Sequence, residues 1–425
     1  MVLTIFIVCW LVLVLVGTPI GVSMIVSSLG YFLYNGVGLN FAAQRIVDGL
    51  NSFPIIAVPL FILAANLFNA SGITHHIFGF ANSLVGHIRG GMGHVNILAS
   101  LFFSGMSGSA LADAGGLGKI EAEAMHKVGY PAELAGALTA VSSILGPLVP
   151  PSIPMVIYGV VSGASIGGLF LGGIVPGLLC TLAMMVMLYI VATREKLPIE
   201  NRKSLAEVRH LFVKSLPALM TPVVIIGGIF GGFFSPTEAA AVTVLYAILV
   251  SRFIYRDMSI KRFWACVYDT AIISATIALI VGGVSMMGVV LAMEKAPEQM
   301  SSLFLSMASG PVGFLLLVCI MLLVLGCFIE VLALLLVLVP SLVPVAASFG
   351  IDPIHFGVIV IFTLMIGTLT PPMGMVLFVV AQSHQLPVHR LTVAVLPWLI
   401  PLLVVLGIMI FFPGTVTFLP NLFLS

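Results

Sequence analysis

The sequence predicts an all-α integral membrane protein made of two similar halves. Apolar residues make up 60% of the 425 residues and charged residues only 7%, whereas a soluble domain carries about 25% charged residues. Apolar runs of about 17 residues or more recur along the chain, and each is long enough to cross ~30 Å of hydrocarbon. The length allows about ten such crossings. A net charge of +1 gives no reason to expect a nucleic-acid partner.

The two halves are indicated by a hexapeptide that occurs twice. GPLVPP at 146–151 recurs as GTLTPP at 367–372, an offset of 221 residues between positions 146 and 367. A further glycine lies 41 residues before each copy, Gly105 before Gly146 and Gly326 before Gly367. Matched halves that carry helix breakers at matched depths are typical of secondary transporters.

The first element is the apolar segment 1–16, which lacks a basic start and a cleavage site and is expected to be a membrane helix rather than a signal peptide. The basic residues then predict which loops face the cytoplasm. Six of them fall in the polar segment 193–215 and four in the next polar segment, 252–262. We therefore expect a cytoplasmic linker at 193–215 between a first repeat, 1–192, and a second repeat, 216–425. Arg45 and Lys295 are the exceptions to this orientation, which places both termini outside.

Two segments are expected to be re-entrant hairpins. The segment 92–118 lies between Arg89 and Lys119, which belong on the same side, and it is too short and too rich in Gly and Ser for two crossings. Its tip is expected near 104–109. The segment 312–345 is expected to enter from the opposite face, with its tip near 326–330. The two halves then have opposite orientations, as in an inverted repeat.

Each Pro-Pro pair lies within a long apolar segment, at about 134–163 and 355–382, and is expected to break a helix there. A break exposes carbonyl oxygens, which suit Na⁺, and helix N-termini, which suit carboxylates. The alternative, that these prolines only kink the helices, is common for one pair but not for two at matched distances from two hairpin tips.

Two acids are expected inside the membrane, Asp113 after the first tip and Glu330 at the second. Such acids are candidates for ion or substrate binding, and a purely structural role is the alternative for both. The five cysteines lie in apolar stretches without metal-type spacing and are expected to be reduced, and the histidines lie near helix ends without zinc spacing.

Four motifs together resemble one family, the large membrane subunits of tripartite ATP-independent periplasmic (TRAP) transporters: FSGMSGSALAD at 103–113, GPLVPPSIP at 146–154, GIDPIHFG at 350–357 and GTLTPPMG at 367–374. The resemblance covers nearly the whole chain. It implies an elevator-type carrier of the bacterial inner membrane, in which a transport domain with both hairpins and both broken helices slides against a scaffold. It also implies Na⁺-driven import of an organic acid anion, such as a C4-dicarboxylate or sialic acid, a periplasmic substrate-binding protein and a small four-helix membrane subunit.

The resemblance also implies site residues. One Na⁺ site would use Ser107, Ser109, Gly146, Val149 and Pro151. The second would use Gly326, Glu330, Gly367, Thr370 and Met373. The candidates for substrate contact are Ser104, Asp113, Pro150 and Pro371. The return arm of the first hairpin, 115–121, is richer in glycine and charge than is expected of the family.

Three alternatives stay open at this point. A stand-alone Na⁺-coupled organic anion carrier of a related fold would work without a binding protein. A channel could also contain matched hairpins, although broken helices facing them favour occluded sites. GMSG at 105–108 resembles the motif of rhomboid-type serine proteases, but that chemistry needs a His base beside the Ser, and the later histidines lie in loops or near helix ends. The chain is therefore not expected to be an enzyme.

Overall fold

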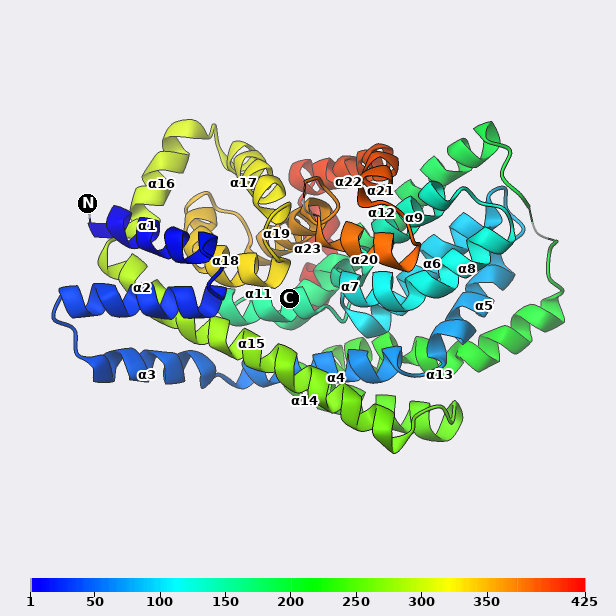
Figure 1. The fold of residues 1–425 in the computed structure, drawn as a ribbon, viewed down its shortest axis with the longest axis horizontal. Helices are drawn as coiled ribbons and strands as arrows, with labels where there is room; N and C mark the ends of the chain where they lie inside the picture. The colour runs from blue at the N-terminus through cyan, green and yellow to red at the C-terminus, as the bar shows by residue number, and fades with distance from the viewer. Residues whose placement is uncertain (1, 200, 373, 425) are drawn as a thin grey trace.

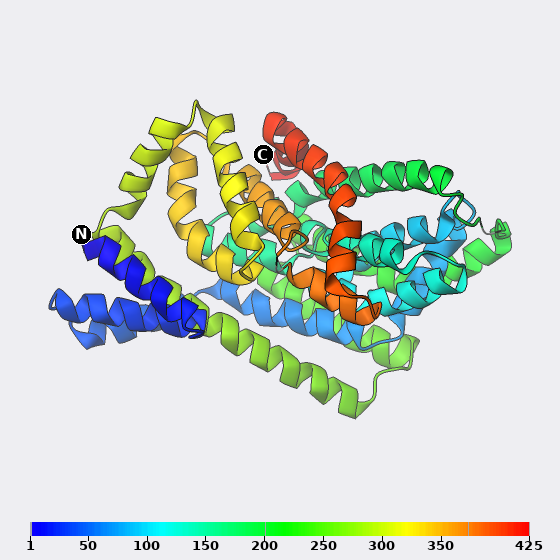
Figure 2. The ribbon, with the colours of Figure 1, turned by 45° about the horizontal axis from the view of Figure 1, so that its top comes forward.

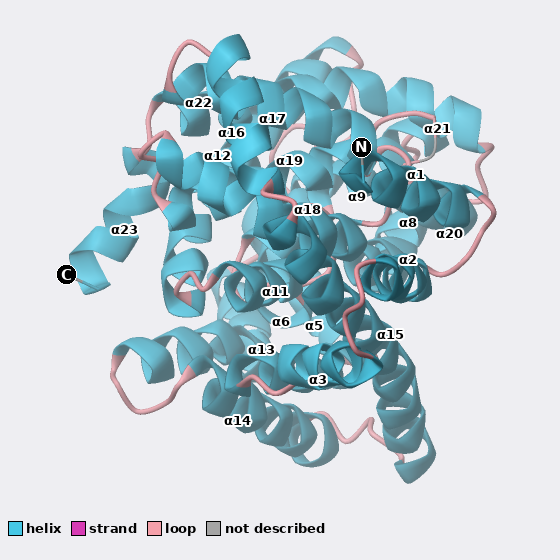
Figure 3. Cartoon of the chain, turned by 90° about the vertical axis from the view of Figure 1, so that its left-hand side faces the viewer, coloured by secondary structure: helices cyan, strands magenta, loops and turns pink. Residues whose placement is uncertain are grey.

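The computed structural model describes residues 2–199, 201–372 and 374–424, and within these ranges every regular element is helical (Figure 3). The first half contains α1 (Val2–Leu15), α2 (Ile20–Tyr34), α3 (Leu39–Leu50), η1 (Phe53–Ile56), α4 (Ala57–Asn69), α5 (Ile73–Val85), α6 (Gly91–Ser107), α7 (Ala110–Ala112), the π-helical turn η2 (Asp113–Leu117), α8 (Gly118–Lys127), α9 (Ala132–Ser142), α10 (Leu145–Leu148), α11 (Ile153–Ser162) and α12 (Ile166–Arg194).

The second half contains α13 (Leu205–Phe230), α14 (Pro236–Leu249), η3 (Val250–Ile254), α15 (Ile260–Met293), α16 (Ala296–Met307), α17 (Pro311–Gly326), α18 (Val331–Ser348), α19 (Pro353–Gly367), α20 (Met375–Ser383), α21 (Val388–Val395), η4 (Leu396–Trp398), α22 (Leu399–Phe411) and α23 (Gly414–Leu424).

Several helices are long and apolar enough to cross a bilayer. Among the described residues six helices meet that condition, and up to eight do if each of two bent helix pairs counts as one span. Further apolar helices, such as α17 and α19, have fewer than 18 residues. The chain is thus an all-helical, multi-span membrane protein. The expected number of ten crossings stays a prediction, because breaks and short helices make length alone a poor guide to which segments cross.

The 34-residue helix α15 runs past α2, α3 and α4 and forms with them an extended layer on one side of the molecule (Figures 1 and 2). At one end of this layer α1 and α2 pack on α15 through a small apolar cluster that includes Phe6, Phe32 and Met286. The helices α3 and α4 meet at a bend of 62° around residues 51–52.

The second group of helices lies against this layer and contains the larger core. In it α6 packs on α9 and α10, α17 packs on α19, and α11 packs on α18. Large apolar side chains fill the contacts, among them the fully buried Phe103, Tyr158 and Phe356. Elements near residues 100, 150, 330 and 360 are thereby brought together although they are far apart in the sequence.

Two segments differ from the expected boundaries. The irregular part of the linker expected at 193–215 is short, because α12 continues to Arg194 and α13 begins at Leu205. The early start of α13 has a local cause: the Ser204 side chain accepts a hydrogen bond from the Glu207 N–H at 3.3 Å, and Glu207 accepts one from the Ser204 N–H at 2.9 Å. The return arm of the first hairpin also extends beyond residue 118, since η2 continues directly into α8 as far as Lys127.

Candidate substrate and ion site

The first turn of the site joins α6 to α7. Helix α6 ends at Ser107, and Gly108 has a φ of +59°, a conformation that residues other than glycine adopt at a cost. The hydroxyl of Ser109 then accepts a hydrogen bond from the Ala112 N–H at 3.4 Å and starts the returning helix. The chain therefore reverses at residues 108–109, within the tip expected from the sequence.

The first helix break lies between α10 and α11, and the segment 132–148, which contains α9 and α10, differs in direction from α11 by 41°. It contains Pro150 and Pro151, which cannot donate backbone hydrogen bonds. The Ser152 hydroxyl accepts a hydrogen bond from the Met155 N–H at 3.3 Å and caps the N-terminus of α11. The break thus leaves the C-terminal end of α10 and the N-terminal end of α11 at the same place.

The first turn and the first break touch through their backbones. The Ile153 N–H donates to the Gly108 carbonyl at 3.3 Å. A Cβ atom on Gly108 would lie 2.5 Å from the Pro151 oxygen, and one on Gly146 would lie 3.1 Å from the Ser109 carbonyl. A side chain at Gly108 would therefore overlap the break, and one at Gly146 would require the turn to shift by a few tenths of an ångström.

A second turn and a second break form a similar contact. Helix α17 ends at Gly326, and Glu330 caps α18 by accepting a hydrogen bond from the Ala333 N–H at 3.0 Å. Helix α19 ends at Gly367, and α20 begins at Met375. A Cβ atom on Gly367 would lie 2.9 Å from the Gly326 Cα, so these two glycines also touch backbone to backbone.

The two turns and the two breaks surround one cavity of about 450 Å³. Its walls also include residues of α4 and α15. The lining residues are Ile62, Ala65, Asn66, Gly108, Ser109, Ala110, Leu111, Ala112, Pro147, Ile153, Pro154, Ile273, Glu330, Val331, Leu332, Met365, Thr368, Met375 and Val376. The first residues of three helices, Ile153 of α11, Val331 of α18 and Met375 of α20, are among them.

This arrangement favours an anion in the cavity. The N-terminal end of a helix carries a partial positive charge, and three such ends open here, although N–H groups at the start of α11 and α18 already donate to Gly108, Ser152 and Glu330. Glu330 is the one charged side chain among the described lining residues, and no Lys or Arg is among them. A carboxylate would therefore be attracted by the positive ends of helix dipoles rather than by basic side chains.

The C-terminal ends of helices lie at the same turns and breaks. Helices α6, α10, α17 and α19 end at Ser107, Leu148, Gly326 and Gly367. The last carbonyls of a helix have no partner within it, and carbonyl oxygens are suitable ligands for Na⁺. The chemistry of the site therefore combines groups for a cation with groups for an anion.

The residues expected to form the site have different positions. Ser109 and Glu330 line the cavity, and Gly146, Gly326 and Gly367 form the backbone contacts described above. Thr370 donates a hydrogen bond to the Ile366 carbonyl at 2.9 Å within the second break. The side chain of Val149 packs toward Gly177 of α12, so that only its backbone is available to the site. Met373 lies outside the described residues.

The four candidates for substrate contact are absent from the lining. Ser104 is fully buried and donates to the Leu101 carbonyl of its own helix. Asp113 is also buried, and it accepts a hydrogen bond from Ser107 at 3.3 Å that links the end of α6 to η2. It does not line the cavity. Pro150 and Pro371 lie within the two breaks but not on the cavity surface. Their contact with substrate stays a prediction.

Two polar residues that line the cavity, Asn66 and Thr368, were not expected from the sequence. Asn66 on α4 donates a hydrogen bond to Thr270 on α15 at 3.0 Å. An amide within the apolar run 58–68 was the available signal, because polar side chains inside a membrane usually have a functional or pairing role. Thr368 lies inside the repeated motif GTLTPP. The prediction for that motif was based on its glycine and prolines, so the threonine was not considered as a lining residue.

Comparison with known proteins identifies the family of the chain. Residues 7–415 match the family described as the DctM component of tripartite ATP-independent periplasmic transporters. The chain belongs to this family. It is a multi-span permease component and not an enzyme.

Two relatives resemble the chain over nearly its whole length. It is 51% identical to the sialic acid TRAP transporter large permease protein SiaM of Vibrio cholerae, over 98% of both chains. It is 37% identical to the C4-dicarboxylate TRAP transporter large permease protein DctM of Pseudomonas aeruginosa, over 93% of this chain and 92% of that one.

A third relative and a solved structure extend the comparison. The sialic acid TRAP transporter permease protein SiaT of Haemophilus influenzae is 45% identical over 97% of this chain and 67% of its own length. The crystal structure of the YdaH transporter of Alcanivorax borkumensis superposes with a TM-score of 0.63 over 91% of this chain and 90% of that one, at 14% sequence identity. At that identity the likeness concerns the fold alone.

Proposed function

We propose that this permease component imports an organic acid anion through the cavity between its two turns and two breaks, driven by a Na⁺ gradient. The observation that carries the proposal is the convergence of three helix N-termini on one cavity, with the C-terminal ends of α6, α10, α17 and α19 beside it. The first set of ends suits a carboxylate, and the second set suits Na⁺.

Two Na⁺ sites are proposed, one at each turn. The first would be formed by the backbone at 107–109 and 146–151, where Gly108 and Gly146 allow the two segments to touch. The second would be formed by the backbone at 326–330 and 367–370, where Gly326 meets Gly367. Glu330 would add a negative charge there that favours a cation.

Sialic acid is the favoured cargo. Among the relatives compared, the sialic acid permease of V. cholerae is 51% identical and the C4-dicarboxylate permease of P. aeruginosa is 37% identical. Sialic acid carries a single carboxylate on a polyhydroxylated ring. The helix N-termini would bind the carboxylate, and Asn66 and Thr368 would be available to hydroxyl groups.

The remaining parts of the proposal follow from membership of the family. A periplasmic binding protein would deliver the anion, and a small membrane subunit would complete the scaffold in the bacterial inner membrane. The two repeats, 1–192 and 216–425, would have opposite orientations with both termini in the periplasm. The hairpins and the broken helices would move together as an elevator against α4, α13 and α15.

The test is uptake of radiolabelled sialic acid and C4-dicarboxylates into proteoliposomes that contain this chain and its membrane partner. An inward Na⁺ gradient is imposed, and candidate binding proteins are added or omitted. We expect accumulation of sialic acid only when both the gradient and a binding protein are present. Uptake with Na⁺ alone would instead favour a stand-alone carrier, and uptake without a Na⁺ gradient would contradict the proposed coupling.

A further inference from the structure

A second acid of the first hairpin, Glu121 on α8, lies buried away from the cavity described above. Its side chain is 1% exposed. Oε2 accepts hydrogen bonds from Asn96 Nδ2 at 2.8 Å and from Thr139 Oγ1 at 3.2 Å, whereas Oε1 has no partner. The acid is thus held between α6 and α9 with one oxygen bonded and the other free.

No basic side chain of the described residues neutralises Glu121. The ion pairs among those residues are Arg45–Asp48, Arg262–Asp257 and Arg390–Glu133. The charged and titratable groups on α8 itself and on the elements packed against it are Lys119, Glu123, His126 and Lys127 on α8, Asp113 on η2, His94 on α6, Glu133 on α9 and His384 directly after α20. An unpaired buried carboxylate costs several kcal/mol, so a bound cation or a proton is required.

The neighbours of Glu121 favour a proton over a metal ion. The two side chains that contact it direct an N–H and an O–H at Oε2. The Asn96 Oδ1 already accepts a hydrogen bond from the Ser142 hydroxyl at 2.8 Å and is not turned toward the acid. A hard cation needs several oxygen ligands, which these residues do not supply, whereas the free Oε1 can carry a proton without any of them.

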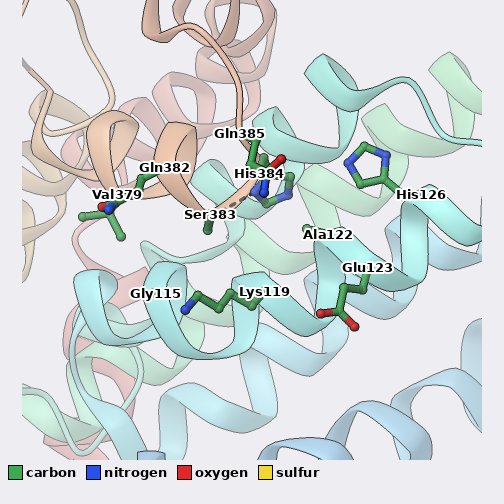
Figure 4. Close-up of a pocket in the computed structure, with 10 residues that line it drawn as sticks. All are labelled: Gly115, Lys119, Ala122, Glu123, His126, Val379, Gln382, Ser383, His384 and Gln385. Atoms are coloured by element: carbon green, nitrogen blue, oxygen red, sulfur yellow. Dashed lines mark hydrogen bonds between the residues drawn. The ribbon is translucent and has the colours of Figure 1, made fainter.

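A polar route connects Glu121 to a second cavity. Thr139 Oγ1 lies 3.4 Å from Nε2 of His384, and Nδ1 of His384 lies 3.1 Å from the Ser383 hydroxyl. His384 and Ser383 line a cavity of about 690 Å³ between α8 and α20, together with Lys119. Figure 4 shows His384 and Ser383 at the end of α20, opposite the residues of α8. An imidazole with a hydroxyl at each ring nitrogen can pass a proton along such a line.

We propose that Glu121 is a proton-binding site of the first hairpin and that it exchanges its proton with the cavity between α8 and α20 through Thr139 and His384. The proton would be carried on an element that the proposed function treats as mobile. The site is separate from the proposed Na⁺ sites, because none of its hydrogen-bonded neighbours belongs to the segments 107–109 or 146–151. It requires neither sialic acid nor Na⁺ to be the cargo.

The test is infrared difference spectroscopy of the purified full-length chain in lipid. The spectrum recorded in D₂O is subtracted from the spectrum recorded in H₂O. Asp113 is also buried with an oxygen that has no partner, so the wild type is expected to show the C=O stretching bands of protonated carboxylic acids, shifted by deuterium. Glu121→Gln is expected to lose the band that Asp113→Asn keeps. Glu123→Gln is the matched control, since Glu123 lies on the same helix, is exposed and lines the cavity. A spectrum of Glu121→Gln that has lost no band relative to the wild type would overturn the proposal.

Two further variants keep the test informative if Glu121→Gln does not fold. Thr139→Val keeps the shape of the side chain but removes a donor to Oε2, so the C=O band should move to higher frequency. An unmoved band would overturn the assignment.

His384→Gln should keep the C=O band but slow its deuterium exchange by ~10-fold or more, because a relay group is lost. Unchanged exchange would exclude the route. Since the spectra need no transport, failure of Na⁺-driven uptake would leave this result standing.

Discussion

At the scale of single residues, glycine determines how closely the turns approach the breaks. Gly108 combines a φ of +59° with a position where a Cβ atom would lie 2.5 Å from the Pro151 oxygen. Gly146 and Gly367 have negative φ but face backbone at 3.1 and 2.9 Å. In each case the neighbour is main chain, which cannot move aside as a flexible side chain could.

Gly108→Ala is therefore expected to reduce Na⁺-driven uptake by more than about tenfold. The left-handed conformation costs alanine about 1–2 kcal/mol before the contact with Pro151 is counted, and 1.4 kcal/mol corresponds to a factor of ten. The measurement is initial uptake at a fixed amount of folded protein. Gly116→Ala is the control, because Gly116 lies on the same hairpin and a Cβ atom there would meet no described atom within 4 Å. Equal activity of the two variants would show that close approach at Gly108 is not required.

The charge of Glu330 gives a second prediction at this scale. Glu330→Gln keeps an oxygen for the Ala333 N–H but removes the negative charge from the cavity. We expect the Na⁺ concentration for half-maximal uptake to rise about tenfold, the effect of losing ~1.4 kcal/mol of cation binding. Uptake at saturating Na⁺ should change less.

Glu238→Gln is the matched control for this prediction. Glu238 also caps a helix, since it accepts a hydrogen bond from the Ser235 N–H at 2.8 Å, but it does not line the cavity. Its replacement should leave the Na⁺ dependence unchanged. If both variants raise the Na⁺ requirement equally, the effect belongs to helix capping and not to an ion site.

The repeat in the sequence locates the site well but does not determine which residues meet. The motifs at 146 and 367 indicate where the helices break, because two prolines cannot continue a helix. The matched spacing also suggests that Gly105 and Gly326 have equivalent contacts. In the structure Gly326 meets Gly367, whereas Gly105 faces Pro222 of α13 and Ser109, one turn later, meets Gly146. The residue that meets the break is thus one helical turn later in the first half than in the second. This difference depends on how the helices pack, and the motif does not indicate it.

At the scale of elements, the linker shows which boundaries a sequence can reveal. Ser204 and Glu207 have the spacing of a capping box, so the start of α13 at Leu205 could have been read from local chemistry. The extension of the first return arm to Lys127 was harder to read. Gly115, Gly116 and Gly118 argue against a helix locally, and packing of α8 on α9 and α20 overrides that preference.

The orientation of the linker gives the third prediction. A cysteine at Asn201, in a Cys9→Ser background, should resist a membrane-impermeant thiol reagent in intact cells and react after permeabilisation. Asn201 is exposed and precedes the Ser204 cap, and Cys9 is the exposed cysteine among the five. The physical reason is that the six basic residues of 193–215 are retained on the cytoplasmic side. Labelling of intact cells would reverse the proposed topology, including the position of both termini.

At the scale of the whole molecule, the sequence could not place the long helix α15 beside α2, α3 and α4. Its surface is apolar on most sides, as expected of a helix in lipid, so hydrophobicity does not distinguish the face that packs on protein. For the same reason Asn66 and Ile273 were not expected at the cavity: they belong to α4 and α15, outside the repeated motifs, and only the assembled fold brings them there.

The proposed elevator makes a prediction about movement between these groups of helices. Helix α6 belongs to the first hairpin, and α13 belongs to the proposed scaffold. A Cβ atom on Gly105 would lie 3.3 Å from the Cβ of Pro222, close to the separation of about 3.5–4.5 Å that a disulfide spans. Gly105→Cys combined with Pro222→Cys is therefore expected to cross-link under oxidation and to stop uptake, and a reductant should restore it.

The control for this cross-link joins two elements that the elevator moves together. The hydroxyls of Ser100 on α6 and Ser142 on α9 are 3.0 Å apart, so Ser100→Cys with Ser142→Cys should also form a disulfide. Uptake should then continue, because α6 and α9 need not shift relative to each other. Cross-linking is measured by the mobility of the chain after proteolysis between the two sites, and uptake in the same proteoliposomes. If the bond between α6 and α13 forms completely and uptake persists, the first hairpin does not slide against α13, and the boundary between the moving and the fixed helices must lie elsewhere.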